Sequence, residues 1–182
     1  DWKDRGTCIL FGDGAGAALL SRAESKQNSS RVYSTHLYSD GWLADYFIIP
    51  GGGSTQPFSQ AVVDTKQHYM QMKGREIYKV AVRMLADTTV EALEKNGMKI
   101  TDLDWLIPHQ ANLRIIEAVA KRLGFPMERV IVNISEYGNT SAATVPTAFD
   151  IAVREGKISR GQLCMFSVFG AGLTYGSALI RY

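Results

Sequence analysis

Two short apolar runs, each followed by a polar turn and a helical pattern, constrain the fold of this chain most. The first run, residues 105–107, precedes Pro108-His109-Gln110-Ala111-Asn112, and the second, residues 130–132, precedes Tyr137-Gly138-Asn139-Thr140-Ser141. In open α/β sheets, ligands bind at the edge where strands end and helices begin. We therefore expect His109 and Asn139 at such an edge, where neutral imidazole and amide groups can both donate hydrogen bonds to one substrate oxygen.

The rest of the chain also alternates between strand and helix patterns. Apolar, β-branched or aromatic runs predict strands at residues 7–11, 17–21, 32–38, 105–107, 130–133, 163–169 and 174–180. Helical spacing predicts helices at residues 75–93, 112–123 and 140–154, the last kinked by Pro146. Residues 51–64 are expected to form a long irregular loop. The alternation predicts an α/β fold with a mixed or mostly parallel sheet covered by helices on both faces.

Composition narrows the class of protein further. The 182 residues are 46% hydrophobic, which suits one domain or slightly more. The net charge of +2 argues neither for nor against a nucleic-acid partner, and none is expected. No apolar run is long enough for a transmembrane helix, so no membrane partner is expected. No metal-spaced Cys/His cluster occurs, so no metal is expected. Cys8 and Cys164 lie in apolar runs and are expected to be reduced core residues of a cytoplasmic protein.

Two glycine-rich segments resemble each other. Residues 9–20 and residues 167–180 both have the pattern strand, glycine turn, strand. Gly12 to Gly16 is followed by no Gly-Lys-Ser/Thr, so a structural turn is expected rather than a P-loop. If the segments mark an internal repeat, residues 1–22 end a first unit, residues 23–182 form the second, and roughly 140 residues precede Asp1. The start without Met fits that expectation.

Local chemistry alone leaves the roles of the polar residues open. His109 could be a structural turn residue, and Asn139, next to Gly138, could adopt a left-handed conformation or cap a helix. His36 and His68 stand in polar contexts and are expected at the surface.

Four motifs, in this order and spacing, carry a resemblance to a known family: residues 11–17 (Phe-Gly-Asp-Gly-Ala-Gly-Ala), 108–112 (Pro-His-Gln-Ala-Asn), 133–143 (Asn-Ile-Ser-Glu-Tyr-Gly-Asn-Thr-Ser-Ala-Ala) and 169–174 (Phe-Gly-Ala-Gly-Leu-Thr). The chain resembles the C-terminal part of β-ketoacyl-[acyl-carrier-protein] synthase III, in the thiolase superfamily. The resemblance implies a thiolase-like α/β fold. Its C-terminal half, residues 23–182, would be a layered αβα unit with a mixed sheet, and residues 1–22 would supply the last strands of the N-terminal half.

The resemblance also implies an activity, that of an acyltransferase. Such enzymes initiate fatty acid synthesis by condensing a short acyl-CoA, such as acetyl-CoA, with malonyl-acyl carrier protein, and CO2 is lost. A Cys-His-Asn triad performs the reaction. His109 and Asn139 would be its donors to the enolate oxygen, and the amide of Ala171 would belong to the oxyanion hole. The resemblance places the family's Cys in the N-terminal half, which is missing here. Cys8 and Cys164 match no catalytic position, and this chain alone is expected to be inactive.

Further residues match binding positions of the family. The CoA and pantetheine positions are Arg5, Gly74, Tyr78 and Asn112. An acidic carrier protein could dock on a basic face formed by Lys79, Arg114, Lys121 and Arg122, although these could equally be a solvated helix face. The CoA thioester and the phosphopantetheine are substrates, no other cofactor is expected, and the resemblance implies a homodimer.

Two other functions remain open. A related ketosynthase III-type enzyme of secondary metabolism would use different starters, and a non-catalytic fragment would only support a partner. The intact pair His109 and Asn139 argues against the fragment. A hydrolase is a weaker alternative, since Cys/His/Asn sets also serve proteases. Thiolases proper are disfavoured because residues 166–172 contain no second cysteine.

Overall fold

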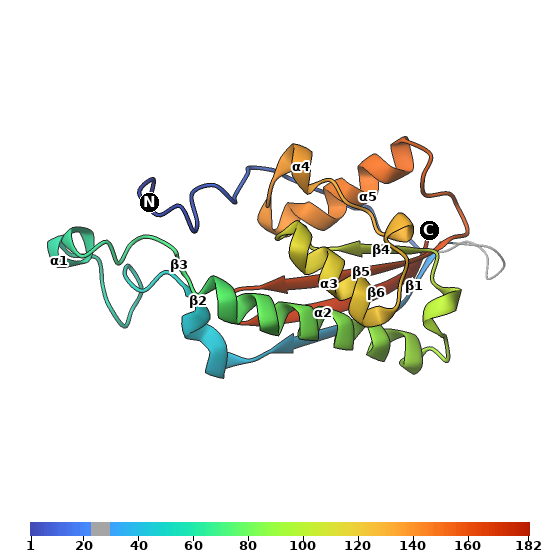
Figure 1. The fold of residues 1–182 in the computed structure, drawn as a ribbon, viewed down its shortest axis with the longest axis horizontal. Coiled ribbons are helices and arrows are strands. Elements are labelled where there is room, and N and C mark those ends of the chain that lie inside the picture. Colours follow the sequence, from blue (N-terminus) through green and yellow to red (C-terminus); the bar gives the residue numbers. More distant parts are fainter. Residues whose placement is uncertain (23–29) are drawn as a thin grey trace.

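The computed structural model describes residues 1–22 and 30–182, and a mixed four-stranded sheet forms its centre (Figure 1). The strand order is β1-β6-β5-β4. These strands span β1 (Arg31–Ser39), β4 (Trp105–Pro108), β5 (Leu163–Gly170) and β6 (Thr174–Arg181). β6 is antiparallel to both β1 and β5, whereas β4 and β5 are parallel. The carboxyl ends of β1, β4 and β5 therefore meet at one edge, as predicted for an α/β fold with a mixed sheet.

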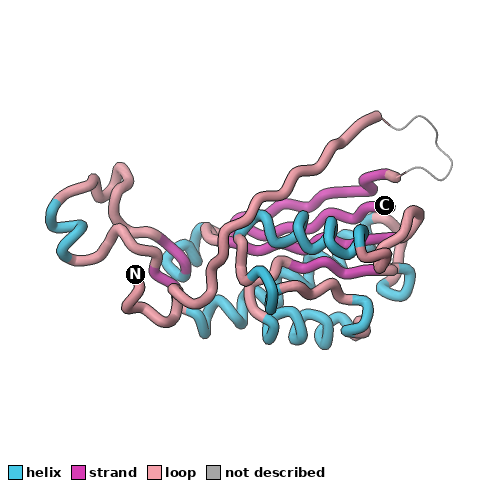
Figure 2. The backbone as a smooth tube through the Cα atoms, turned by 90° about the horizontal axis from the view of Figure 1, so that it is seen from above, coloured by secondary structure: helices cyan, strands magenta, loops and turns pink. Residues whose placement is uncertain are grey.

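Helices cover both faces of the sheet. The long α2 (Gly74–Lys95) packs with α3 (Leu113–Leu123) on one face, and α5 (Thr144–Arg154) packs against β4 on the other. Figure 2 shows helices on both sides of the strands. Because successive strand side chains point to opposite faces, Leu106 joins the core under α2 and α3 while Ile107 joins the core under α5. This alternation produces the αβα layers.

Capping residues end α3 close to its predicted bounds. The Asn112 side chain accepts a hydrogen bond from the backbone N–H of Arg114 at 2.9 Å and caps α3, which ends at Gly124 in the left-handed conformation. The prediction of a kink at Pro146 is wrong. Pro146 is the third residue of α5, and N–H groups of a first turn have no intrahelical partner, so proline removes no bond there.

Three of the predicted strands do not form. Residues 7–10 make turns, residues 12–22 have no regular structure, and Val130 makes only an isolated bridge to Leu106. An apolar run becomes a strand only where a neighbouring backbone takes up its polar groups. At the N-terminal segment that neighbour is a single residue, Asn139, which exchanges backbone hydrogen bonds with Leu10 and Gly12.

The glycines of residues 12–16 let a neighbouring segment approach this backbone closely, and they do not form the expected tight turn. A Cβ on Gly12 would lie 2.5 Å from the Tyr137 carbonyl oxygen, and one on Gly16 would overlap the Pro146 ring. The segment therefore lies directly against the chain that carries Asn139 and the start of α5. The proposed boundary at residues 22 and 23 falls beside residues 23–29, which lie outside the described residues, and stays a prediction.

Shorter elements complete the chain. The segment between β1 and α2 forms an arm that contains a second, two-stranded sheet made of β2 (Phe47–Ile48) and β3 (Gln71–Met72). In Figure 1 this arm projects beyond the central sheet. The predicted long loop at residues 51–64 lies in this arm but includes a short helix at its end. The remaining helical elements are η1 (Gly41–Tyr46), α1 (Gln60–Asp64), η2 (Ile100–Asp102), η3 (Met127–Arg129), α4 (Ile134–Tyr137) and η4 (Ser141–Ala143).

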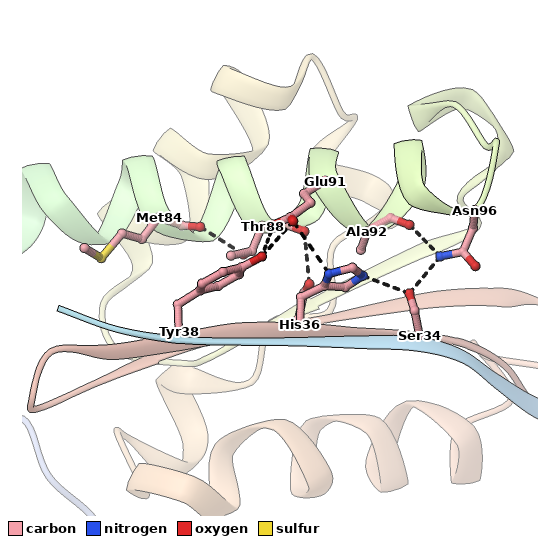
Figure 3. A network of polar contacts seen from close by, with 9 residues as sticks. Ser34, His36, Tyr38, Met84, Thr88, Glu91, Ala92 and Asn96 are labelled. Carbon is pink, nitrogen blue, oxygen red and sulfur yellow. Dashed lines mark hydrogen bonds and ion pairs between the residues drawn. The ribbon is translucent and has the colours of Figure 1, made fainter.

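A polar network fastens β1 to α2 (Figure 3). Tyr38 donates to the Glu91 carboxylate at 2.6 Å, and the Asn96 amide donates to the hydroxyl of Ser34 at 2.7 Å. His36 lies between these pairs, 3.0 Å from the Ser34 hydroxyl and 3.8 Å from Glu91. The expectation of two surface histidines is wrong, because this packing leaves His36 half-buried, and His68 is half-buried against Tyr69.

Candidate active site

A cavity of about 1130 Å³ opens at the edge where β1, β4 and β5 end. His109, which follows β4, and Asn139, which follows α4, both line it. Residues from the ends of β1 and β5 line it too. The prediction that the two polar turns meet at one edge of an α/β sheet is therefore confirmed.

The backbone fixes His109 where the parallel pairing of β4 and β5 ends. Its N–H donates to the Ser167 carbonyl at 2.8 Å. The imidazole Nδ1 lies 2.6 Å from the Thr144 hydroxyl. Burial lowers the pKa of His109 from 6.5 to about 4, because the charged imidazolium would lose its hydration. The ring is therefore neutral near pH 7.

The Thr144 hydroxyl determines which imidazole nitrogen carries the proton. Its oxygen lies 2.9 Å from the Ser141 carbonyl, to which it can donate, and then His109 donates through Nδ1–H. The Ser141 carbonyl also accepts the backbone N–H of Thr144. The hydroxyl can therefore turn and donate to Nδ1 without leaving that carbonyl unpartnered. In the second arrangement Nε2 carries the hydrogen and is a donor.

The Asn139 amide is oriented by its backbone neighbour. Ser141 N–H donates to Oδ1 of Asn139 at 3.0 Å, and Ser141 adopts a φ of 56°. Since Oδ1 faces a donor, the NH2 group is the end that remains for a ligand. Asn139 itself has no positive φ, so the left-handed alternative is wrong. The capping alternative holds, because the Asn139 side chain accepts the N–H of Ser141, the first residue of η4.

The turn after β5 forms another wall of the cavity. Ala171 lines it, and its φ lies outside the left-handed region. Gly172 takes the demanding conformation instead, with a φ of 126°. An alanine is therefore tolerated at position 171, where the resemblance implies a backbone N–H donor.

All four predicted CoA and pantetheine positions line this same cavity: Arg5, Gly74, Tyr78 and Asn112. They come from the N-terminal turns, the first two turns of α2 and the cap of α3. Arg5 and Tyr78 are exposed, and Asn112 also caps its helix. Residues far apart in the sequence are thus brought together, although what they bind stays a prediction.

The predicted docking residues lie outside the cavity lining and on the surface of α2 and α3: Lys79, Arg114, Lys121 and Arg122. Arg122 forms an ion pair with Asp87 at 3.1 Å, so part of its charge is compensated. All four side chains are exposed, as both a docking face and a solvated helix surface require.

Neither cysteine lines the cavity. Cys164 is buried in the core under α5, and burial raises the pKa of its thiol to about 12. Cys8 is only half-buried, so its expected core position is wrong. Both are free thiols, and a group with a pKa like that of Cys164 is a poor source of thiolate.

Sequence reasoning missed three residues that hold this site, namely Gln110, Ser141 and Thr144. Ser141 and Thr144 orient the two donors, and the Gln110 side chain contacts the backbone of Pro108 and Asn133, which precede His109 and Asn139. Gln110 stands in a quoted motif, but nothing local shows which backbone groups its amide meets. In the part of the chain that the structure describes, no three His, Cys, Asp or Glu side chains converge as metal ligands, and no helix is long and apolar enough to cross a membrane.

Comparisons with known proteins match this arrangement. A family model for 3-oxoacyl-[acyl-carrier-protein] synthase III, C terminal, matches residues 93–182, and one for 3-oxoacyl-[acyl-carrier-protein] synthase III matches residues 1–41. The beta-ketoacyl-[acyl-carrier-protein] synthase III of Alkalilimnicola ehrlichii is 50% identical over 182 residues, 100% of this chain and 54% of that relative. The chain thus spans about half the length of the curated relatives it matches.

Solved structures are similar as well. The 3-oxoacyl-[acyl-carrier-protein] synthase III of Aquifex aeolicus superposes with a TM-score of 0.86 at 44% identity, covering 100% of this chain and 53% of that one. The priming beta-ketosynthase of the R1128 polyketide biosynthetic pathway gives a TM-score of 0.70 at 34% identity, covering 82% and 45%. These likenesses confirm the predicted thiolase-like fold.

Proposed function

Because the chain belongs to the 3-oxoacyl-[acyl-carrier-protein] synthase III family, we propose that it supplies the donor pair for a decarboxylative Claisen condensation. The substrates would be a short acyl-CoA, such as acetyl-CoA, and malonyl-acyl carrier protein. The reaction would be the first condensation of fatty acid synthesis.

One observation carries this proposal. His109 and Asn139 line a single cavity, and each has one polar end held by neighbouring protein atoms. Nδ1 of His109 is engaged by Thr144, and Oδ1 of Asn139 by Ser141. The ends that remain, Nε2 and the amide NH2, are the ones that can donate to a ligand oxygen in the cavity.

Two neutral donors suit the difficult step of this reaction. When the malonyl thioester loses CO2, the electron pair of the broken C–C bond passes to the thioester oxygen as an enolate. Donors that meet the developing negative charge lower the barrier, and each is worth about 2.7–4 kcal/mol in comparable oxyanion holes. The enolate carbon then attacks the acyl thioester of a cysteine, the C–S bond breaks, and the thiolate leaves.

The low pKa of His109 supports a donor that does not change its charge. For Nε2 to donate, the Thr144 hydroxyl must donate to Nδ1, which is the second arrangement described above. We assign Thr144 this role as a positioning residue, since it contacts the imidazole and not the substrate.

The resemblance assigns the nucleophilic cysteine to a part of the family outside these 182 residues. Arg5 would bind the CoA adenine, while Gly74, Tyr78 and Asn112 would line the pantetheine path and the Ala171 amide would join the oxyanion hole. We include in the proposal the cytoplasmic location, the homodimer, the docking of carrier protein on α2 and α3, and catalysis without a metal or other cofactor.

A second candidate is a ketosynthase of this family that serves secondary metabolism. The similarity to the priming ketosynthase of a polyketide pathway supports this second candidate. The two candidates differ in the starter, so the protein as its gene encodes it should be assayed with malonyl-acyl carrier protein and acyl-CoA substrates of increasing length. A preference for acetyl-CoA supports fatty acid initiation, a preference for other starters supports the second candidate, and no condensation with any starter overturns both.

A further inference from the structure

A proline interrupts the hydrogen-bond ladder between the two turns that carry the donors. Ile131 N–H donates to the Leu106 carbonyl at 2.9 Å, which is one rung of a parallel pairing. In a regular parallel ladder the next rungs would join residue 108 N–H to the Ile131 carbonyl and residue 133 N–H to the residue 108 carbonyl. Residue 108 is proline and has no N–H, so the first of these rungs cannot form.

The Gln110 side chain replaces these missing rungs. Its Nε2 donates to the Pro108 carbonyl at 2.7 Å and to the Ile131 carbonyl at 3.1 Å. Its Oε1 accepts the backbone N–H of Asn133 at 3.1 Å. Both amide hydrogens and the carbonyl oxygen are thus used, and the side chain is 0% exposed. The amide therefore joins the backbone after β4 to the backbone of residues 131–133, and without it their buried polar groups would be unpaired.

This amide joins the bases of the two donor turns. His109 lies between Pro108 and Gln110, and Asn133 begins the short segment that ends at Asn139. A change in the distance between the Pro108 and Asn133 backbones would therefore move the two donors relative to each other. Misplacement by about 1 Å can cost about a hundredfold in rate, even when it arises away from the reacting atoms.

We infer that Gln110 is a positioning residue that sets the separation of the His109 and Asn139 donors. The inference rests on the proposed function, because it assumes that both donors must reach one oxygen. Gln110 does not line the cavity, so it acts through the backbone and not on the substrate.

The test uses the protein as its gene encodes it and compares two glutamines that contact opposite ends of β4. Gln110 contacts Pro108, the last residue of β4, and Gln162 contacts Trp105, the first. Gln162 accepts hydrogen bonds from the Trp105 indole at 2.9 Å and from Ser159 N–H at 2.8 Å, and it does not line the cavity. Gln110→Met and Gln162→Met each remove a bridging amide and keep the side-chain length. We expect both to lower Tm. Only Gln110→Met should lower kcat for malonyl decarboxylation, by about 10–100-fold, with KM changed less than about twofold.

Gln110→Glu provides a second variant of nearly identical shape. An ionised carboxylate cannot donate to the Pro108 and Ile131 carbonyls, whereas the protonated acid recovers one donor. We expect its kcat relative to the native protein to rise as the pH falls. If the folded Gln110→Met protein, or Gln110→Glu should Gln110→Met fail to fold, retains the native kcat, the inference is overturned.

A crystal structure of the Gln110 variant separates this inference from the proposed reaction. If the native protein catalyses no condensation, the proposed function fails. The positioning role is still tested by the distance between His109 Nε2 and Asn139 Nδ2. A changed distance in the Gln110 variant, with no change in the Gln162 variant, supports the role, and equal distances in all three proteins contradict it.

Discussion

Nδ1 of His109 lies 2.6 Å from the hydroxyl oxygen of Thr144, a residue at the first position of α5. The hydroxyl is the sole hydrogen-bond partner of the imidazole in the described residues, and Thr144 is 1% exposed. A helix on the opposite face of the sheet from α2 therefore controls the protonation pattern of a group at the sheet edge.

This contact predicts distinct effects for two substitutions of Thr144. Thr144→Val keeps the branched shape but leaves Nδ1 without a partner, so we expect decarboxylation to slow by roughly 10–100-fold, the equivalent of one buried unsatisfied group. Thr144→Ser keeps the hydroxyl and should stay within about threefold of the native rate. Equal rates for Thr144→Val and the native protein in a single-turnover decarboxylation assay would rule out the positioning role of Thr144.

The lowered pKa of His109 predicts a pH-dependent stability. In the unfolded chain this imidazole is protonated below about pH 6.5, whereas in the folded protein it is protonated only below about pH 4. In that window the unfolded state binds more protons, so the stability contributed by the neutral ring is lost as the pH falls from 6.5 to 4, by up to about 3 kcal/mol.

His109→Gln removes the titrating group and serves as the reference. Urea unfolding across the same pH window should give a smaller loss of unfolding free energy for His109→Gln than for the native protein. Parallel pH profiles for the two proteins would mean that His109 titrates normally in the fold.

The turn after β5 predicts an asymmetry between two neighbouring residues. Gly172→Ala places a Cβ 3.0 Å from the Thr174 side chain at a φ of 126°, a conformation that costs roughly 1–3 kcal/mol for other residues. We expect it to lower Tm and to slow acyl transfer by displacing the Ala171 amide. Ala171→Gly should change acyl transfer little, because the backbone N–H remains. The reverse order of effects would disprove the assignment of this turn as a backbone donor.

The basic face of α2 and α3 predicts a selective effect on the carrier protein. Arg114→Glu and Lys121→Glu should raise KM for malonyl-acyl carrier protein and leave KM for acyl-CoA unchanged, since in the proposed docking only the carrier protein would contact that face. Lys157→Glu, on the exposed segment after α5, is the control for a charge change elsewhere. The solvated-surface alternative predicts no difference among the three variants, which steady-state kinetics at low salt will decide.

The sequence predicted the helices and the central strands because their patterns are local. Helical spacing defines α2, and helical spacing together with the caps Asn112 and Gly124 defines α3, without reference to the rest of the fold. The strand expected at residues 130–133 failed because strand formation depends on a partner, and Pro108 and Gln110 end that pairing after one rung. The apolar runs near the N-terminus failed for the same reason.

The site was predictable in part. His109, Asn139 and the wall residues could be named because motifs and a family resemblance mark them, and all of them line one cavity. Thr144 could not be assigned, because it contacts His109 from a separate element. Ser141 could not be assigned, because its hydrogen bond to Asn139 depends on a backbone φ of 56° that no sequence pattern marks. The tautomer of His109 depends on one hydroxyl hydrogen, which no sequence pattern specifies.

The most direct test of the account separates the two half-reactions in the protein as its gene encodes it. His109→Ala and Asn139→Ala should each abolish malonyl decarboxylation, because one donor to the enolate oxygen is lost, while the cysteine is still acylated by acyl-CoA at nearly the native rate. Intact-protein mass spectrometry reports acylation, and release of labelled CO2 reports decarboxylation. If both variants lose the two half-reactions equally, or if both still release CO2 at the native rate, His109 and Asn139 are not the enolate donors.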